Sequence, residues 1–155
     1  LMAVLLERHV RRMLEALDPL LRPPLGSAPE PRFARTARAI VTAVLRVHAA
    51  DPDLQRVLHA EIARTERLPQ VREVEQELTG RVKVLLDRYR RQLRVKDPAL
   101  AAFVLVHLVE GLTHAALAHR PELLRSRRFG DEITALVLAC VGLAGRARRR
   151  RRRAG

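Results

Sequence analysis

The sequence predicts an all-α protein with six helices, and three observations support this fold class. Alanine, leucine, arginine, glutamate and valine dominate the 155 residues, and aromatic residues make up only 3% of them. This composition has an intrinsic propensity for helix. Apolar residues also recur every three or four positions along most of the chain, which is the period of a helix with one buried face. With 48% hydrophobic residues, a chain of this length suits one domain with its own core.

The first helix is expected over residues 1–21, where apolar side chains have helical spacing but no capping residue precedes them. Because the pattern starts at full hydrophobic density, we expect the native chain to extend upstream. Residues 22–32 contain four prolines and a Gly-Ser pair, which exclude a helix or strand interior and predict a loop. A second amphipathic helix is expected over about residues 31–48.

The third and fifth helices have the same start signal, an aspartate followed by a proline. Asp51 precedes a helix expected over residues 52–67, and Asp97 precedes one expected over residues 98–119. Each carboxylate can cap free backbone N–H groups, and each proline occupies the first helical position, where its missing N–H costs nothing. Between them, residues 69–93 have the most regular apolar stripe in the chain and predict the fourth helix.

The fifth helix is apolar around its circumference, because Glu110 is its one formal charge between Leu100 and Ala118. Such a helix must be buried in a large core, between subunits or in a bilayer. Glu110, His107 and His114 lie near its middle, where ionisable groups in a bilayer are costly. The four amphipathic helices also need a common core, so the pattern favours a soluble bundle over a membrane span.

The sixth helix, expected over residues 130–144 after a charged loop at residues 121–128, is also apolar on almost every side. Two such helices have more apolar surface than four amphipathic helices can cover. We therefore expect a two-fold dimer in which the last two helices pair with their copies as a four-helix bundle. The candidate interface residues are Leu105, Leu108, Glu110, Leu112, His114, Ile133, Val137, Cys140 and Val141.

Charge and cysteine content limit the possible functions. The net charge is +13, but seven arginines lie within residues 146–153, and without them the balance is +6. This tail, residues 146–155, is expected to be disordered; it either binds nucleic-acid phosphates without sequence preference or is simply solvated. The single cysteine, Cys140, excludes an internal disulfide and indicates a reducing cytosol. It is interpreted as a small buried hydrophobe.

No motif supports catalysis or a cofactor. Ser27 and Ser126 are the only serines and both lie in loops, and the seven glycines form no phosphate-binding cradle. His107, Glu110 and His114 share one face of the fifth helix and could supply three metal ligands. A metal site normally needs a fourth donor, so a hydrogen-bonded polar seam at the dimer interface or pocket wall is the favoured interpretation.

The order of the segments resembles a known family. LMAVLLERHVRRMLEAL is followed by DPDLQRVLHAEIAR, LPQVREVEQELTGRVKVLL, DPALAAFVLVHLVEGLTHAAL and GDEITALVLACVGLA. This pattern is similar to the C-terminal domain of a TetR-family transcriptional regulator, over nearly all of the chain except the arginine tail. The most specific part is LVEGLTHAAL together with the following GDEITALVL.

The resemblance implies three parts. Residues 1–21 would be the helix that connects to an N-terminal DNA-binding head, and this head is absent from the chain. Residues 22–145 would form the effector-binding and dimerisation domain. Residues 146–155 would be the tail. Family members are typically homodimeric repressors in which a small molecule enters the helical body and shifts the connecting helix. The resemblance thus implies a cytoplasmic, non-enzymatic regulator that binds itself and a small-molecule effector, binds DNA only in the full-length protein, and has no membrane partner.

In that family arrangement, the second to fifth helices would enclose the effector pocket. The candidate pocket residues, chosen from the inward stripes of these helices, are Val44, His48, Leu58, His59, Ile62, Leu85, Tyr89, Phe103 and His107. The alternative function is a stand-alone helical dimerisation module, or a membrane-associated module, with a basic tail. A monomer in plain buffer, or dependence on detergent, would favour this alternative.

Overall fold

The computed structural model describes residues 2–22, 32–65 and 69–143 of the chain. Within these ranges it leaves the side chains of residues 2, 3, 5, 6, 58, 59, 61–65 and 69–71 undescribed. The described elements, in chain order, are α1 (Met2–Leu21), α2 (Phe33–Ala50), α3 (Pro52–Thr65), α4 (Pro69–Arg88), α5 (Pro98–His119), the short 3-10 helix η1 (Pro121–Arg125) and α6 (Arg127–Cys140). The predicted all-α fold with six helices is confirmed.

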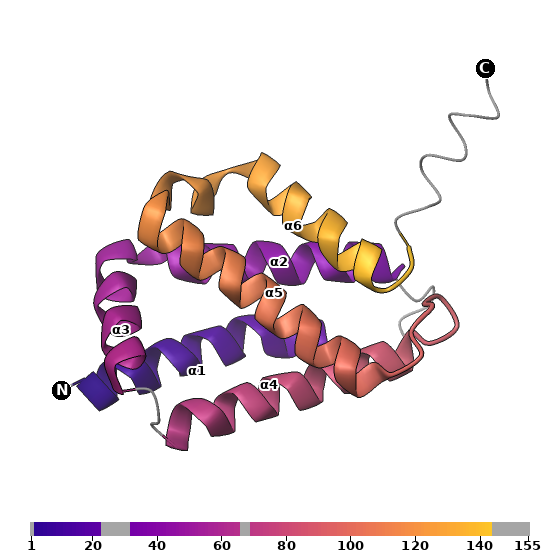
Figure 1. Cartoon of the computed structure of the whole chain (residues 1–155), viewed down its shortest axis with the longest axis horizontal. Coiled ribbons are helices and arrows are strands. Elements are labelled where there is room, and N and C mark those ends of the chain that lie inside the picture. The colour runs from indigo at the N-terminus through magenta and orange to yellow at the C-terminus, as the bar shows by residue number, and fades with distance from the viewer. Residues whose placement is uncertain (1, 23–31, 66–68, 144–155) are drawn as a thin grey trace.

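The helices form a bundle with α3 across one end (Figure 1). The most extensive helix–helix contacts join α4 to α5, α2 to α6 and α1 to α2. Helix α2 runs antiparallel to α1, and α5 runs antiparallel to α4, so the start of α1, the end of α2, the start of α4 and the end of α5 all lie near α3 (Figure 1). The core between the helices includes Leu17, Val41, Leu86, Leu117 and Ile133, each at most 2% exposed.

The two Asp-Pro start signals operate as the sequence predicts. The Asp97 carboxylate accepts hydrogen bonds from the backbone N–H groups of Ala99 and Leu100, both at 3.0 Å. Asp51 accepts one from the N–H of Leu54, also at 3.0 Å. These bonds satisfy backbone donors that have no partner in the first turn of a helix.

Helix α4 ends at Arg88, earlier than the apolar spacing predicts. After it, the backbone N–H of Gln92 bonds to the carbonyl of Tyr89 at 2.8 Å, a three-residue spacing that tightens the chain into turns. The Gln92 side chain then accepts a hydrogen bond from the N–H of Phe33 at 2.9 Å. Tyr89 and Leu93 still face the core from these turns, so the apolar spacing continues past the end of the helix.

Helix α6 begins at Arg127, three residues before the predicted start. Ser126 provides the cap, because its Oγ accepts a hydrogen bond from the N–H of Phe129 at 3.3 Å. From the sequence, this serine was expected to lie in a loop. Residues 121–125 of that loop form η1 instead.

The other end of α6 is closed by a glycine. Gly142 has a φ of 79°, a conformation that side chains with a Cβ rarely adopt. The N–H of Leu143 bonds to the carbonyl of Leu138 at 2.8 Å, and the N–H of Gly142 to that of Ala139 at 3.1 Å. This pair of bonds is a Schellman motif, and it ends the helix at Cys140, before the predicted end.

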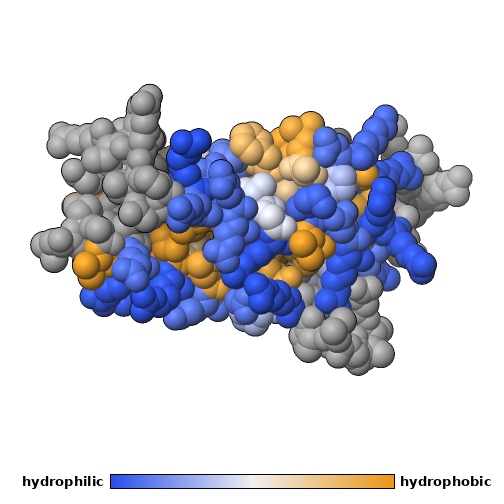
Figure 2. All heavy atoms as spheres, turned by 90° about the horizontal axis from the view of Figure 1, so that it is seen from below, coloured by the Kyte–Doolittle hydropathy of each residue, from blue (hydrophilic) through white to orange (hydrophobic). Residues whose placement is uncertain are grey.

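Helix α5 is buried on one side only. Ala102, Leu105 and Leu117 are at most 5% exposed, whereas Leu100 and Phe103 on the other side are 59% and 52% exposed. Among the described residues, α5 is the one helix long and apolar enough to span a bilayer by length and composition. The face of the molecule on the α4 side, seen in Figure 2, is mainly hydrophilic with scattered hydrophobic patches.

Candidate ligand-binding cavity

A cavity of about 240 Å³ lies between the helices. Its wall is built from 26 residues, of which 20 are apolar, so most of the surface that a ligand would meet is hydrocarbon. Every one of the six helices contributes to the wall. Helix α1 provides six lining residues, which are His9, Val10, Met13, Leu14, Leu17 and Leu21.

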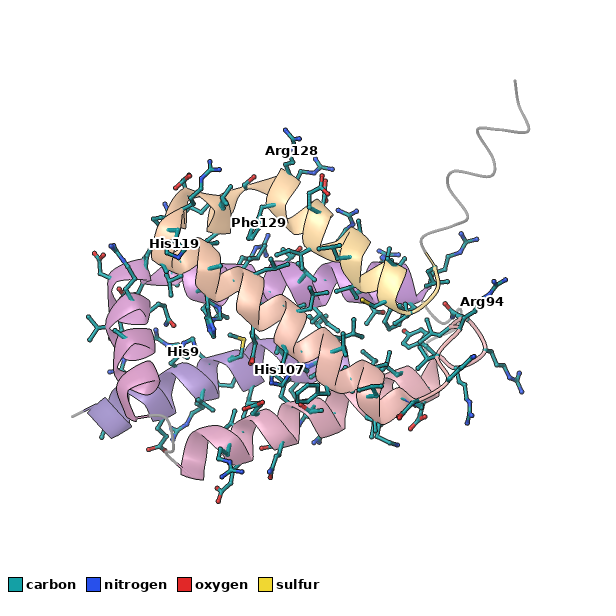
Figure 3. All side chains as sticks on the ribbon, viewed as in Figure 1. His9, Arg94, His107, His119, Arg128 and Phe129 are labelled. Carbon is teal, nitrogen blue, oxygen red and sulfur yellow. The ribbon has the colours of Figure 1, made fainter. Side chains whose placement is uncertain are left out.

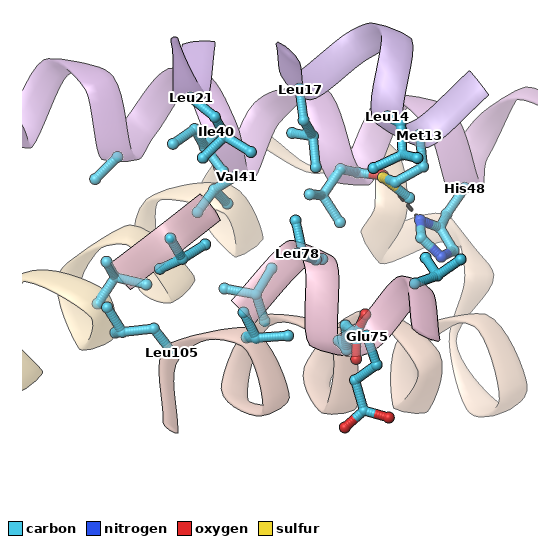
Figure 4. A pocket seen from close by; sticks show the side chains of 18 of the residues that line it. Met13, Leu14, Leu17, Leu21, Ile40, Val41, His48, Glu75, Leu78 and Leu105 are labelled. Atoms are coloured by element: carbon cyan, nitrogen blue, oxygen red, sulfur yellow. Dashed lines mark hydrogen bonds between the residues drawn. The ribbon is translucent and has the colours of Figure 1, made fainter. Parts of the chain in front are cut away.

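The apolar part of the wall forms one end of the cavity. Figure 4 shows Leu21, Ile40, Val41 and Leu105 together at this end. The end of α1, the start of α2 and the first half of α5 lie toward this end, because α2 runs antiparallel to α1 and α5 runs antiparallel to α4 (Figure 1). A ligand in this part of the cavity would be held by burial of apolar surface alone.

The other end of the cavity, near α3, holds the polar lining residues, and apolar side chains such as Met13 and Leu14 lie beside them (Figure 4). All six polar lining residues lie on the helix segments that meet at this end: the first half of α1, the end of α2, the start of α3, the first half of α4 and the second half of α5. They are His9, His48, Gln55, Glu75, Glu110 and His114. Figure 4 shows His48 and Glu75 on this side, and Figure 3 shows His9 on α1 close to α3. We call this group of six residues the polar end.

Three histidines form a chain of edge-on contacts across the polar end. The ring centroids of His9 and His48 are 5.2 Å apart, and those of His48 and His114 are 5.4 Å apart. His48 Nδ1 donates to the carbonyl of Val44 at 2.9 Å, and Gln55 Nε2 donates to His9 Nδ1 at 2.8 Å. A nitrogen that accepts a hydrogen bond carries no proton, so this geometry fits a neutral His9.

Two groups at the polar end have shifted pKa values. Burial, together with the charges of His48 and Arg12, lowers the pKa of His9 from its ordinary 6.5 to about 4. Burial also raises the pKa of Glu110, as does the neighbouring carboxylate of Glu75, while His107 acts in the opposite direction.

A histidine–glutamate pair borders the cavity. His107 Nε2 lies 2.6 Å from Glu75 Oε1, and Figure 3 shows His107 on α5 beside α4. Both side chains are about 40% exposed, so this pair lies at the edge of the protein rather than in its core. Glu75 is therefore already held by a partner, and Glu110 is the more enclosed of the two carboxylates.

The nine predicted pocket residues are placed in three different environments. Val44, His48 and Leu85 line the cavity. Tyr89 is buried behind the wall with its hydroxyl 3.1 Å from Thr36 Oγ1, whereas Phe103 and His107 lie outside the wall with their rings 4.0 Å apart. The side chains of the remaining three, Leu58, His59 and Ile62, lie outside the described residues.

The predicted interface residues are also divided. Leu105, Glu110, His114 and Val137 line the cavity of a single chain, and Ile133 and Val141 are at most 1% exposed in its core. Leu108 and Leu112 are half-buried. Cys140 is exposed in the single chain, which differs from its interpretation as a buried hydrophobe. The apolar side chains that remain exposed on α5 and α6 are a different set, which includes Leu100, Phe103, Val104 and Leu136.

The lining residues on α1 and two of the polar ones, Gln55 and Glu75, were not predicted from the sequence. Helix α1 was treated as a connecting element, although His9, Met13 and Leu17 are spaced four residues apart and so share one face. The position of His9 within an apolar stripe was the one sequence signal that could have indicated a cavity wall on this face of α1. No comparable signal exists for Glu75, which lies among the other acidic residues of α4.

A metal centre finds no support in the part of the chain that the structure describes, where no three His, Cys, Asp or Glu side chains are grouped to hold an ion. The arginine tail, residues 146–155, lies outside the described residues.

The comparisons with known proteins give one result. A family model with the description "Tetracyclin repressor-like, C-terminal domain" matches residues 33–140, which is more than two thirds of the chain. Neither the curated proteins nor the solved structures contain a match to the chain. The matched region runs from the first residue of α2 to the last residue of α6, and α1 precedes it.

Proposed function

The chain belongs to the family of tetracyclin repressor-like C-terminal domains, and we propose that it is the effector-sensing and dimerisation domain of a TetR-type transcriptional repressor. The observation that carries the proposal is the cavity, which has a mainly apolar wall and a few convergent polar groups. These are the usual properties of a small-molecule site. In this role the domain is cytoplasmic, carries out no catalysis and acts on DNA through a separate DNA-binding head.

Helix α1 supports the coupling of ligand binding to DNA binding. It contributes six residues to the cavity wall and lies immediately before the matched family region. A ligand that fits one position of α1 better than another shifts α1 toward that position, because a ligand moves an equilibrium only by its difference in affinity. We propose that α1 transmits this shift to the DNA-binding head, which then releases its operator.

Ligand binding can be tested with a blocked cavity. Figure 4 shows Leu78 extending into the cavity from α4, so Leu78→Trp should fill it. Val84→Trp is the matched control, because Val84 is on the same helix and 64% exposed. A ligand at one hundred times its Kd stabilises the protein by about 2.7 kcal/mol, which raises Tm by several degrees in a chain of this size.

The assay is thermal unfolding with three eight-carbon probes, 1-octanol, n-octylamine and octanoate. At least one probe should raise the Tm of the wild type and of Val84→Trp, and this rise should disappear in Leu78→Trp. If none of the three probes changes the wild-type Tm, or if Leu78→Trp responds as the wild type does, the cavity is not a ligand site.

Dimerisation is proposed through the exposed apolar side chains of α5 and α6. Leu100, Phe103 and Val104 are 59%, 52% and 42% exposed, and Leu136 on α6 is 46% exposed. Leu100, Phe103 and Val104 share one face of α5 by their helical spacing, and exposed apolar groups of this kind mark interaction surfaces. We propose that this face pairs with its two-fold copy. It replaces, as the proposed interface, those residues predicted from the sequence that the single chain buries in its own core.

Size-exclusion chromatography with light scattering tests the dimer. The wild type should have the mass of a dimer in plain buffer, and Phe103→Glu should shift it toward a monomer because the change places a charge in the interface. Val84→Glu, on the exposed face of α4, is the control and should remain dimeric. A wild-type monomer would refute the proposal, and solubility only in detergent would favour a membrane-associated module, for which α5 has the length.

A further inference from the structure

We propose that the effector is a small lipophilic amine, whose hydrocarbon part fills the apolar end of the cavity and whose ammonium group lies beside Glu110 at the polar end. This inference deepens the proposed function and rests on it. Three properties of the cavity carry it, which are the separation of apolar from polar residues, the sign of the charge at the polar end, and the cavity volume.

The separation of residue types indicates an amphiphile. A ligand with polar groups spread over its surface would leave some of them against Leu21, Val41 or Leu105, where the described part of the wall offers only apolar side chains. An unpaired buried polar group costs free energy, so such ligands are disfavoured. A molecule with one polar head and one apolar body can satisfy both ends of the cavity together.

The charges of the wall favour a cation. Two carboxylates, Glu75 and Glu110, belong to the polar end, and none of the described residues that line the cavity is lysine or arginine. His9 accepts the hydrogen bond of Gln55 and is therefore neutral in this geometry. An anionic head would face two carboxylates with no permanent positive charge in the wall, which is electrostatically unfavourable.

Glu110 is the group best suited to receive an ammonium. Glu75 is already paired with His107 at 2.6 Å. Among the described residues, no side-chain hydrogen bond contributes to the pKa of Glu110; burial and the charge of Glu75 oppose its ionisation, and His107 offsets only part of this effect. A cation beside Glu110 would remove this penalty, because an opposite charge nearby favours the ionised carboxylate.

The cavity volume limits the size of the amine. Pockets for drug-sized ligands usually enclose about 300–1,000 Å³, and this cavity of about 240 Å³ lies below that range. The site therefore fits an amine with a single alkyl chain or one small ring, rather than a large polycyclic compound. An alkylamine is protonated at neutral pH in the same way as a lysine side chain.

The experiment compares probes that share one tail. Binding of n-octylamine, 1-octanol and octanoate to the full chain is measured by isothermal titration calorimetry at pH 7. Hydrogen bonds to charged groups contribute enough to change affinity about tenfold or more, so n-octylamine should bind at least about tenfold tighter than 1-octanol. Octanoate should bind more weakly than either.

A pair of variants then assigns the preference to one carboxylate. Glu110→Gln should lower n-octylamine affinity about tenfold or more and leave 1-octanol affinity within about twofold. Glu73→Gln is the matched control, since Glu73 is an exposed residue of α4, and it should bind all three probes as the wild type does. Circular dichroism and 1-octanol binding show whether Glu110→Gln is folded.

The outcomes separate the two proposals. If no probe binds, both the ligand site and the amine preference are wrong. If 1-octanol or octanoate binds as tightly as n-octylamine, the cavity is a ligand site but the amine proposal is wrong. The amine proposal is also wrong if a folded Glu110→Gln variant keeps the full preference for n-octylamine. The comparison among wild-type affinities stands even if that variant fails to fold.

Discussion

His9 should make the stability of the protein depend on pH, and the substitution His9→Asn should remove this dependence. The imidazole lies at the polar end of the cavity, where burial and then the charges of His48 and Arg12 lower its pKa to about 4. In the unfolded chain it should titrate near 6.5. Between these two values the unfolded state binds a proton that the folded state does not.

The direction in which stability changes with pH follows from this difference in proton binding. Stability rises with pH wherever the unfolded state binds more protons, so the contribution of His9 is fully present above about pH 6.5 and is lost as pH falls toward 4. At about 1.36 kcal/mol per pKa unit, the difference between the folded and unfolded pKa values corresponds to at most about 3 kcal/mol in the free energy of unfolding. His9 is only half-buried, and screening by solvent lowers this value, so we expect about 1 to 3 kcal/mol.

Urea unfolding followed by circular dichroism at several pH values between 4.5 and 7.5 measures the effect. Carboxylates also titrate in the lower part of this range, so the quantity of interest is the difference between the wild type and His9→Asn. The wild type should lose about 1 to 3 kcal/mol more than the variant as pH falls. The matched control is His119→Asn at the exposed end of α5, which should behave as the wild type does. Equal pH dependence in the wild type and His9→Asn would refute the reasoning.

Three further substitutions test the packing that shapes the cavity, each measured by urea unfolding at pH 7. Tyr89→Phe should destabilise the protein by about 1 kcal/mol, because it removes the buried hydrogen bond to Thr36; an unchanged midpoint would mean that this bond contributes nothing. Gly142→Ala should cost about 1–3 kcal/mol, because an added Cβ would lie 2.7 Å from the Cβ of Arg94 and φ is 79°; a neutral result would contradict the Schellman motif. Asp97→Ala should cost about 1 kcal/mol through loss of the α5 cap, whereas Asp97→Asn should retain most of the stability, and equal loss in both would contradict a capping role.

Local signals in the sequence were sufficient to predict the helices. The Asp-Pro pairs, the proline-rich segment and the three-to-four spacing of apolar residues each act over a few residues, so they can be recognised without knowledge of the fold. The family resemblance depends on the order of these same segments. The ends of α4 and α6 were less predictable, because Gln92 and Arg94 make their contacts with residues far away in the sequence.

The two faces of α5 and the composition of the cavity became visible only when the helices were assembled. In the sequence, α5 has apolar residues on every side, and nothing local distinguishes the buried Leu105 from the exposed Phe103. The packing of α5 against the other helices of the bundle decides between them. In the same way, His9 and Glu110 are about one hundred residues apart and line the same cavity only because α1 and α5 both pass the end of the bundle near α3. A binding site of this kind is a property of long-range packing, whereas helix formation depends mainly on neighbours along the chain.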